Sequence, residues 1–136
     1  MKETQNAKLK TQNDNSKVKS EDIKLRAYRF SLSVIQFVNS FPNQISYRII
    51  ADQLIRSATS IGANIVEAKS SSSRREFIKY YEIALKSANE TKYWLCLCRD
   101  SFSEKRDKSN QLLQESIEIS NIIAVSILTL KGKRKF

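Results

Sequence analysis

Apolar residues recur at helical spacing in four long segments of the chain. In the first segment they alternate at intervals of four and three residues, and a second apolar row flanks the first. This heptad pattern predicts a helix with one buried face. Ser20 is the candidate N-cap, and Pro42 ends the helix because the residue before a proline is driven out of the α region. The first row is Ile23, Ala27, Phe30, Val34, Phe37 and Phe41, and the second is Leu25, Tyr28, Leu32 and Ile35.

Three more segments carry the same kind of pattern, over about residues 44–69, 73–99 and 103–131. Ser73 followed by Glu76 is a capping-box signature for the start of the third helix. Gly132 is expected to end the fourth helix. Each of these helices also has apolar residues beside its main stripe.

Short connections make neighbouring helices antiparallel, so the predicted fold is all-α, an up-down-up-down four-helix bundle over residues 20–131. Residues 1–19 have almost no large apolar side chains and are expected to be disordered. Residues 132–136 form a basic C-terminal tail. The surplus apolar rows indicate either a contact with other copies of the chain or the ordinary scatter of exposed Ile and Leu.

The composition agrees with a helical protein inside the cell. The chain has 136 residues with only two Gly and one Pro, which argues against a fold with many turns. Two Cys indicate a reducing compartment, and the polar N-terminus does not resemble a signal peptide. Residues 122–130 are too short an apolar run to cross a membrane. The expected location is the cytoplasm, with no membrane partner.

Residues 56–68, RSATSIGANIVEA, gather small side chains in the middle of the second helix. Gly costs about 1 kcal/mol relative to Ala in a helix, so a close approach of a neighbouring helix is the expected compensation. Packing within the monomer explains this stretch better than a ligand site does. Asn64 and Glu67 lie beside core positions and are expected to fix register or orientation. The predicted packing and assembly motif is Arg56, Ser57, Ala58, Ile61, Gly62, Asn64 and Glu67.

The net charge of +10, from 24 Lys and Arg against 14 Asp and Glu, is concentrated at the chain ends. Such a basic tail either binds phosphate or acidic surfaces, or only keeps the protein soluble. Two arginines at a helix N-terminus also favour anions. Five aromatic residues (Tyr28, Tyr80, Tyr81, Tyr93 and Trp94) fall on or next to core rows, so packing explains most of them. The candidate nucleic-acid-binding residues are Arg74, Arg75, Lys79, Lys131, Lys133, Arg134 and Lys135.

The residues needed for catalysis are missing from the sequence. There is no His, and the chain has no Gly-rich phosphate loop. Cys96 and Cys98 stand two apart on a helix and therefore point to nearly opposite sides, where they cannot share a metal. We expect no catalytic residues, cofactor or metal, and hence no enzyme.

The most specific stretches are residues 56–65, Glu67, residues 76–78 and residues 87–90. They resemble a family of proteins that is named after open reading frames in intervening sequences of bacterial 23S ribosomal RNA and is also labelled S23 ribosomal proteins. The resemblance covers about residues 23–130 and implies antiparallel four-helix bundles that assemble as rings of five. A related branch, the accessory proteins of diversity-generating retroelements, is basic and pentameric and binds a reverse transcriptase and nucleic acid. A serine run, residues 70–73, replaces the Gly-rich basic turn usual in the family.

Two functional hypotheses follow. The first is an oligomeric, basic, non-enzymatic scaffold, a homopentamer, that binds RNA or DNA through phosphate contacts. The alternative is a protein-interaction accessory subunit, for example of a retroelement reverse transcriptase, with little nucleic-acid binding of its own.

Overall fold

The computed structural model describes residues 22–134, with side-chain environments up to residue 132. This part of the chain forms four long helices and one short 3-10 turn, with no strand among the described residues. The elements are α3 (Ile23–Asn39), α4 (Ile45–Lys69), α5 (Arg74–Ser101), η2 (Ser103–Lys105) and α6 (Arg106–Arg134). The predicted all-helical fold with four long helices is thus confirmed, while the N-terminal segment 1–19 lies outside the described residues.

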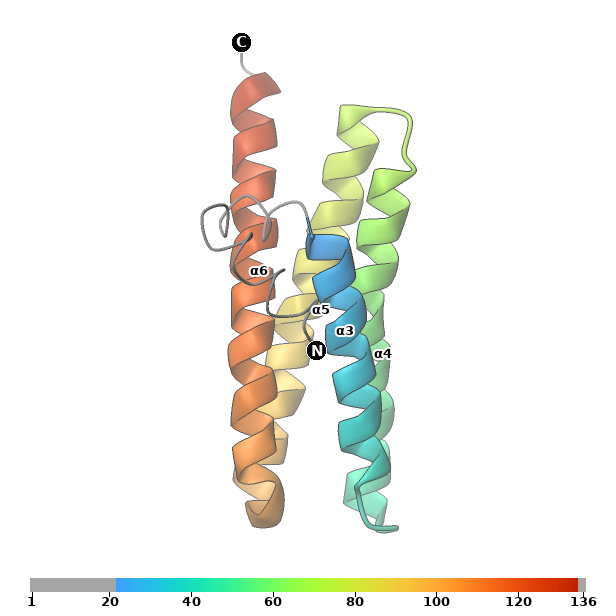
Figure 1. Ribbon diagram of the computed structural model, residues 1–136, viewed down its shortest axis with the longest axis vertical. Coiled ribbons are helices and arrows are strands. Elements are labelled where there is room, and N and C mark those ends of the chain that lie inside the picture. Colours follow the sequence, from blue (N-terminus) through green and yellow to red (C-terminus); the bar gives the residue numbers. More distant parts are fainter. Residues whose placement is uncertain (1–21, 135–136) are drawn as a thin grey trace, which may run out of the picture.

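The helices lie side by side along one axis, and the chain reverses direction at each connection (Figure 1). Hydrogen bonds between α4 and α5 show the reversal directly. Ser57 bonds to Thr91 and Ser60 bonds to Ser87, so the partners run in opposite order along the two helices. On the next pair, Lys92 of α5 bonds to Ser120 of α6.

The helix boundaries differ from the expectation at two places. The cap residue of α3 is Asp22, which makes no side-chain capping bond, and Ser20 lies outside the described residues. Gly132 does not end α6, because the helix continues through it to Arg134. No described glycine has the positive φ that a helix-stopping glycine adopts. The tail predicted at residues 132–136 is therefore helical at its start.

The cap of α5 is as predicted. The backbone N–H of Glu76 donates to the Ser73 hydroxyl at 3.1 Å, and Ser73 itself has extended backbone geometry. Such a cap satisfies one of the helix's otherwise unpaired N–H groups and contributes about 1 kcal/mol. The serine run thus fixes where α5 begins.

The core is built from the predicted heptad rows. The second row of α3 is exposed, and its Tyr28 side chain is 61% exposed. Tyr93 of α5 is 59% exposed. Packing accounts for Tyr80, Tyr81 and Trp94, as expected for most of the aromatic residues, but not for these two tyrosines. The buried side chains include Ile23, Ala27, Phe30 and Val34 of α3, Leu54, Ala58, Ile61 and Ile65 of α4, Tyr81, Ala84, Ala88 and Leu95 of α5, and Leu112, Ile119, Ile123 and Ile127 of α6.

An aromatic cluster closes the end of the bundle that is lowest in Figure 1. The ring of Tyr47 stacks on that of Phe102 at 3.7 Å between centroids, and Phe41 meets both edge-on. The Tyr47 hydroxyl donates to the Glu104 carboxylate, which raises the pKa of Tyr47 to about 12 and lowers that of Glu104. Lys105 also bonds to the backbone and hydroxyl oxygens of Ser40. These contacts join the α3–α4 connection to the α5–α6 connection.

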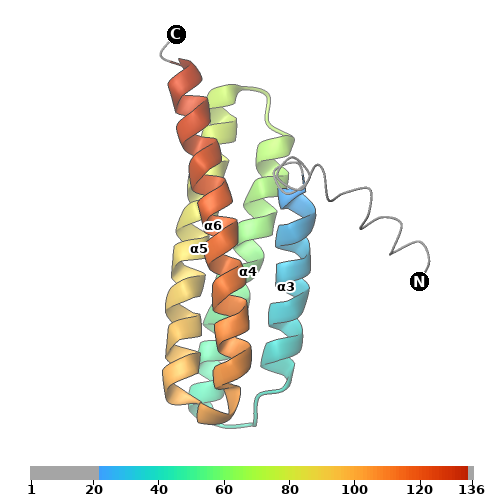
Figure 2. The ribbon, with the colours of Figure 1, turned by 60° about the vertical axis from the view of Figure 1, so that its left-hand side comes forward.

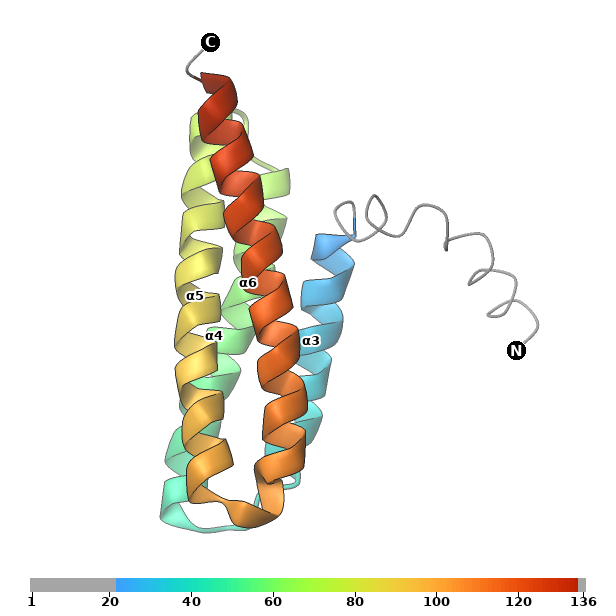
Figure 3. The same cartoon turned by 90° about the vertical axis from the view of Figure 1, so that its left-hand side faces the viewer.

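At the opposite end, the described part of α3 begins short of the ends of the other helices. Arg26, near the start of α3, bonds to Glu115 and Glu118 of α6 at 2.8 and 2.9 Å. Beyond this level α4, α5 and α6 continue without α3 beside them, as the views in Figures 2 and 3 agree. We call this the open end.

One helical stretch, Ser103–Gly132, is long and apolar enough to suit a membrane crossing by length and composition. The core helix of a soluble protein meets the same criterion. The inner residues of this stretch, including Ile119 and Ile123, are fully buried within the bundle.

Candidate nucleic-acid interface

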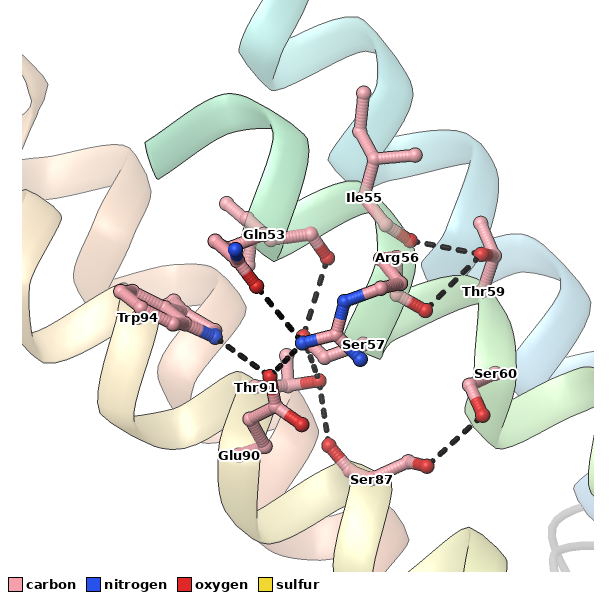
Figure 4. A network of polar contacts seen from close by, with 11 residues as sticks. Gln53, Ile55, Arg56, Ser57, Thr59, Ser60, Ser87, Glu90, Thr91 and Trp94 are labelled. Carbon is pink, nitrogen blue, oxygen red and sulfur yellow. Dashed lines mark hydrogen bonds and ion pairs between the residues drawn. The ribbon is translucent and has the colours of Figure 1, made fainter. Parts of the chain in front are cut away.

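The small hydroxyl residues of α4 form a polar seam with α5 (Figure 4). The Thr91 hydroxyl lies 3.0 Å from that of Ser57 and 2.8 Å from the carbonyl oxygen of Ser87. One turn away, the Ser87 hydroxyl donates to that of Ser60 at 2.9 Å. Ser57 and Thr91 are both buried, and each hydroxyl also lies within hydrogen-bond distance of a carbonyl oxygen of its own helix. The seam fixes the register between the two helices.

Arg56 lies at the surface end of the same seam. Its guanidinium pairs with Glu90 of α5 and donates to Gln53 at 2.8 Å. Trp94 Nε1–H also donates to Glu90 at 3.0 Å, and this bond, followed by those from Arg56, lowers the pKa of Glu90. The partner across the seam could not be found without the helix register.

The packing around Gly62 explains why a glycine lies inside α4. Ala58 and Ile61 are fully buried, and Gly62 lies against α3. A Cβ placed on Gly62 would be 3.6 Å from the Cβ of Ala27, which is ordinary van der Waals contact. The helices are close here, but a methyl group would fit. A groove of about 590 Å³ runs along this crossing and is lined by residues that include Leu25, Tyr28, Gly62 and Val66.

The two polar residues of the small-residue stretch have no structural need for a partner from another helix. The Asn64 amide donates to the carbonyl oxygen of Ser60 at 2.8 Å and to its hydroxyl at 3.0 Å, within α4 itself. Glu67 is exposed to solvent. Neither side chain bonds to another helix in the ways predicted for fixing the orientation of the bundle, whereas Ser57 and Thr91 do bond between α4 and α5.

The basic residues that the sequence placed in two separate patches come together at the open end. Arg74, Arg75 and Lys79 are exposed at the start of α5, and Lys131 is exposed near the end of α6. Arg75, Lys79 and Lys131 line one hollow of about 470 Å³ beside Ser73. The pairing of α5 with α6 produces this arrangement.

Three of the predicted tail residues are only partly described. Lys133 and Arg134 belong to the last turn of α6, although their side chains are not described. Lys135 lies outside the described residues. The helix thus carries both residues beyond Lys131.

Lys131 is bound weakly enough to exchange its partner. Its Nζ lies 2.8 Å from Glu82 Oε2, with both side chains about half exposed. Surface ion pairs of this kind contribute about 0–1 kcal/mol. A phosphate that entered the hollow could therefore replace Glu82 at low cost.

Lys69 is a basic residue of this end that sequence reasoning missed. It lies in the last turn of α4, with its Nζ 5.5 Å from the centroid of the Phe77 ring. A hollow of about 310 Å³ is lined by Lys69, Arg74 and Phe77, on a different side of α5 from Arg75. Its position immediately before the serine run was the available signal, because that turn brings it level with Arg74. We call Lys69, Arg74, Arg75, Lys79 and Lys131 the basic end.

Comparison with known proteins places this bundle in a family. The family model for the 23S rRNA-intervening sequence protein matches residues 19–125. A crystal structure of a protein of unknown function from the S23 ribosomal protein family of Bacteroides thetaiotaomicron VPI-5482 is also similar. It is 34% identical, with a TM-score of 0.74, and the match covers 80% of this chain and 97% of that chain. Comparison with curated proteins finds no match. The chain therefore belongs to the 23S rRNA-intervening sequence protein family.

Proposed function

We propose that this protein is an oligomeric, non-enzymatic scaffold of the cytoplasm that binds RNA or DNA through phosphate contacts. The observation that carries the proposal is the meeting of Arg75, Lys79 and Lys131 around one hollow, from two helices that are far apart in the sequence. Lys and Arg contacts to phosphate release counterions and need no base recognition. The family name associates its members with intervening sequences of 23S rRNA, which is compatible with a nucleic-acid partner.

We further propose that copies of the antiparallel bundle assemble into a ring of five. The exposed second row of α3, with Leu25, Tyr28 and Leu32, offers an apolar surface beside the groove at Gly62. A ring would carry five copies of the basic end and a formal charge of about +50, from five chains of +10 each, and repeated weak contacts multiply into avidity. Light scattering at micromolar concentration tests the assembly. A monomer mass would contradict it.

A pair of charge-matched variants tests the binding site. Arg75→Gln with Lys79→Gln removes two charges from the basic end. Arg106→Gln with Lys108→Gln removes two exposed charges from the opposite end of the bundle. Binding of labelled single-stranded RNA and duplex DNA is measured by anisotropy over a salt series, for both variants and the parent.

The expected result is specific to the basic end. Each lost phosphate contact flattens the slope of log K against log salt by about 0.9 on duplex DNA, so the first variant should lose roughly 1.8. The Arg106 and Lys108 variant should keep the parent slope, and no sequence should be preferred. Absence of binding by the parent protein at low salt would contradict the function. Equal losses in both variants would show that the charges act without a site.

The protein-interaction alternative, which includes a reverse transcriptase as a possible partner, has its own supporting observation. Val125 and Leu128 of α6 are exposed aliphatic residues close to the basic end, and phosphate binding does not use them. They are the starting point of the next inference.

A further inference from the structure

At the open end, the described part of α3 does not reach the last turns of α6. The inner face of α3 begins at Ile23, whereas α6 continues past the Arg26 ion pairs to Arg134. Residues 122–134 of α6 would extend about 20 Å at about 1.5 Å per residue. Above the start of α3, Figure 1 shows α5 between α6 and α4.

This position is a lined hollow and is largely apolar. It has a volume of about 330 Å³ and is bounded by α4, α5 and α6. Phe77 and Tyr81 contribute from α5, and their rings stack at 4.6 Å between centroids. Val125 and Leu130 contribute from α6, and Val125 is 61% exposed. We call this hollow, lined by Lys69, Phe77, Tyr81, Val125, Ser126, Thr129 and Leu130, the slot.

Cationic residues surround the slot. Lys69 lines it directly, and the other members of the basic end are at the adjoining ends of α5 and α6. The described residues of this end include five cations against the three carboxylates Glu67, Glu76 and Glu82. The sequence adds Lys133, Arg134 and Lys135. An occupant must therefore combine an apolar stripe with acidic flanks.

Two nearer occupants fit this chemistry poorly. Residues 1–21 contain five Lys against three acidic residues, and Met1, Leu9 and Val18 are their only large aliphatic side chains. The basic end of a second copy would bring like charges together. Nucleic acid would meet the cations but would leave the aliphatic side chains of α6 unburied.

We propose that the slot binds an acidic amphipathic helix of a partner protein, about three to four turns long. Its apolar stripe would cover Phe77, Val125 and Leu130, and its Asp or Glu residues would face Lys69 and the rest of the basic end. This mode is a helix lying in a groove with anchors at helical spacing. It shares the cations of the basic end with the proposed phosphate binding, and its apolar contacts distinguish the two.

The test uses the full chain and synthetic peptides of about 14 residues, sufficient for the length of the slot. The first peptide is an amphipathic helix with Leu at i, i+3, i+4 and i+7 and Glu on both flanks. The second has the same composition in scrambled order. The third keeps the Leu stripe but carries Lys in place of Glu. Affinities are measured by fluorescence anisotropy at about physiological salt.

The variants remove apolar contacts without changing charge. Val125→Gln alters the slot, and Ile45→Gln is the matched control on a similarly exposed position near the start of α4. We expect the acidic amphipathic peptide to bind at least tenfold more tightly than the other two. The slot variant should lose at least tenfold, and the control should be unchanged. Circular dichroism checks that both variants remain folded, and nucleic-acid binding should persist in both.

Four outcomes would overturn the proposal. Equal binding of the scrambled peptide would mean charge attraction alone, and equal binding of the Lys peptide would exclude acidic recognition. A fall in the mass of the Val125→Gln variant by light scattering would make this surface a contact between copies. A tenfold gain in affinity on Leu9→Gln with Val18→Gln in the full chain would identify the N-terminal segment as the occupant.

Discussion

The crossing of α3 and α4 at Gly62 predicts opposite effects for a small and a large side chain. In Gly62→Ala the new methyl group would lie 3.6 Å from the Cβ of Ala27 and 3.7 and 3.8 Å from its carbonyl carbon and oxygen. These are ordinary contacts, so the substitution introduces no clash. Replacing Gly by Ala within a helix then stabilises the fold by about 0.5–1 kcal/mol. The midpoint of thermal unfolding should rise by about 2–4 °C.

Gly62→Leu extends the side chain by three more carbons toward the same backbone. The leucine must displace α3 or rotate into the groove beside Tyr28, and overpacking of this kind costs about 1–3 kcal/mol. The free energy of unfolding should therefore differ between the Ala and Leu variants by roughly 2–4 kcal/mol, with Ala the more stable. If the groove also serves ring assembly, the Leu variant should lose mass in light scattering as well.

Urea unfolding followed by circular dichroism measures both variants against the parent chain. A Leu variant as stable as the Ala variant would show that the groove accepts the side chain and that the crossing is not tight. An Ala variant less stable than the parent by 1 kcal/mol or more would contradict the ordinary contact of 3.6 Å between the new Cβ and the Cβ of Ala27. It would show that the methyl group clashes with α3.

The other predictions concern buried and paired groups. Tyr47→Phe removes the bond that lowers the pKa of Glu104, so the stability lost should be largest at neutral pH and shrink at acid pH as the carboxylate becomes protonated; equal losses at pH 7 and pH 3 in urea unfolding would contradict this. Burial raises the pKa of the Cys98 thiol to about 12, whereas Cys96 is only half-buried; a thiol reagent at pH 8 should label Cys96 first and Cys98 only on unfolding, as mass spectrometry of peptides would reveal. Ser109 has a fully buried hydroxyl with no hydrogen-bond partner in the described part of the chain, so Ser109→Ala should keep or raise the midpoint of thermal unfolding, and a drop of several degrees would point to a partner for that hydroxyl.

The heptad rows made the fold predictable because buried positions in a bundle obey one spacing. The row from Ile23 to Phe37 is buried as expected, and Ser73 caps α5 as its sequence indicated. Rules based on a few neighbouring residues failed where the rest of the structure decides the backbone conformation. A glycine near a helix end can stop a helix, but Gly132 keeps helical geometry and α6 continues.

The candidate site was harder to predict, since it depends on which helix ends meet. The sequence identified Arg75 and Lys131 separately, but only the pairing of α5 with α6 places them around one hollow. The same applies to Arg56, whose partner Glu90 is on another helix. Lys69 was missed because a single lysine at a helix end has no pattern of its own. Contacts between helices set these arrangements, and the spacing of residues within one helix does not predict such contacts.

The contrast between the two bundle ends has a consequence for hydrogen exchange. At one end Tyr47, Phe102 and Lys105 link both helix connections, so amide protons there should exchange only through global unfolding. At the other end α6 runs on past the 17-residue α3, and its last turns should exchange through local opening. A ligand that binds the opening end would slow exchange there while leaving the rest of the molecule unchanged. Binding would then order the end of α6, while the rest of the bundle stays rigid.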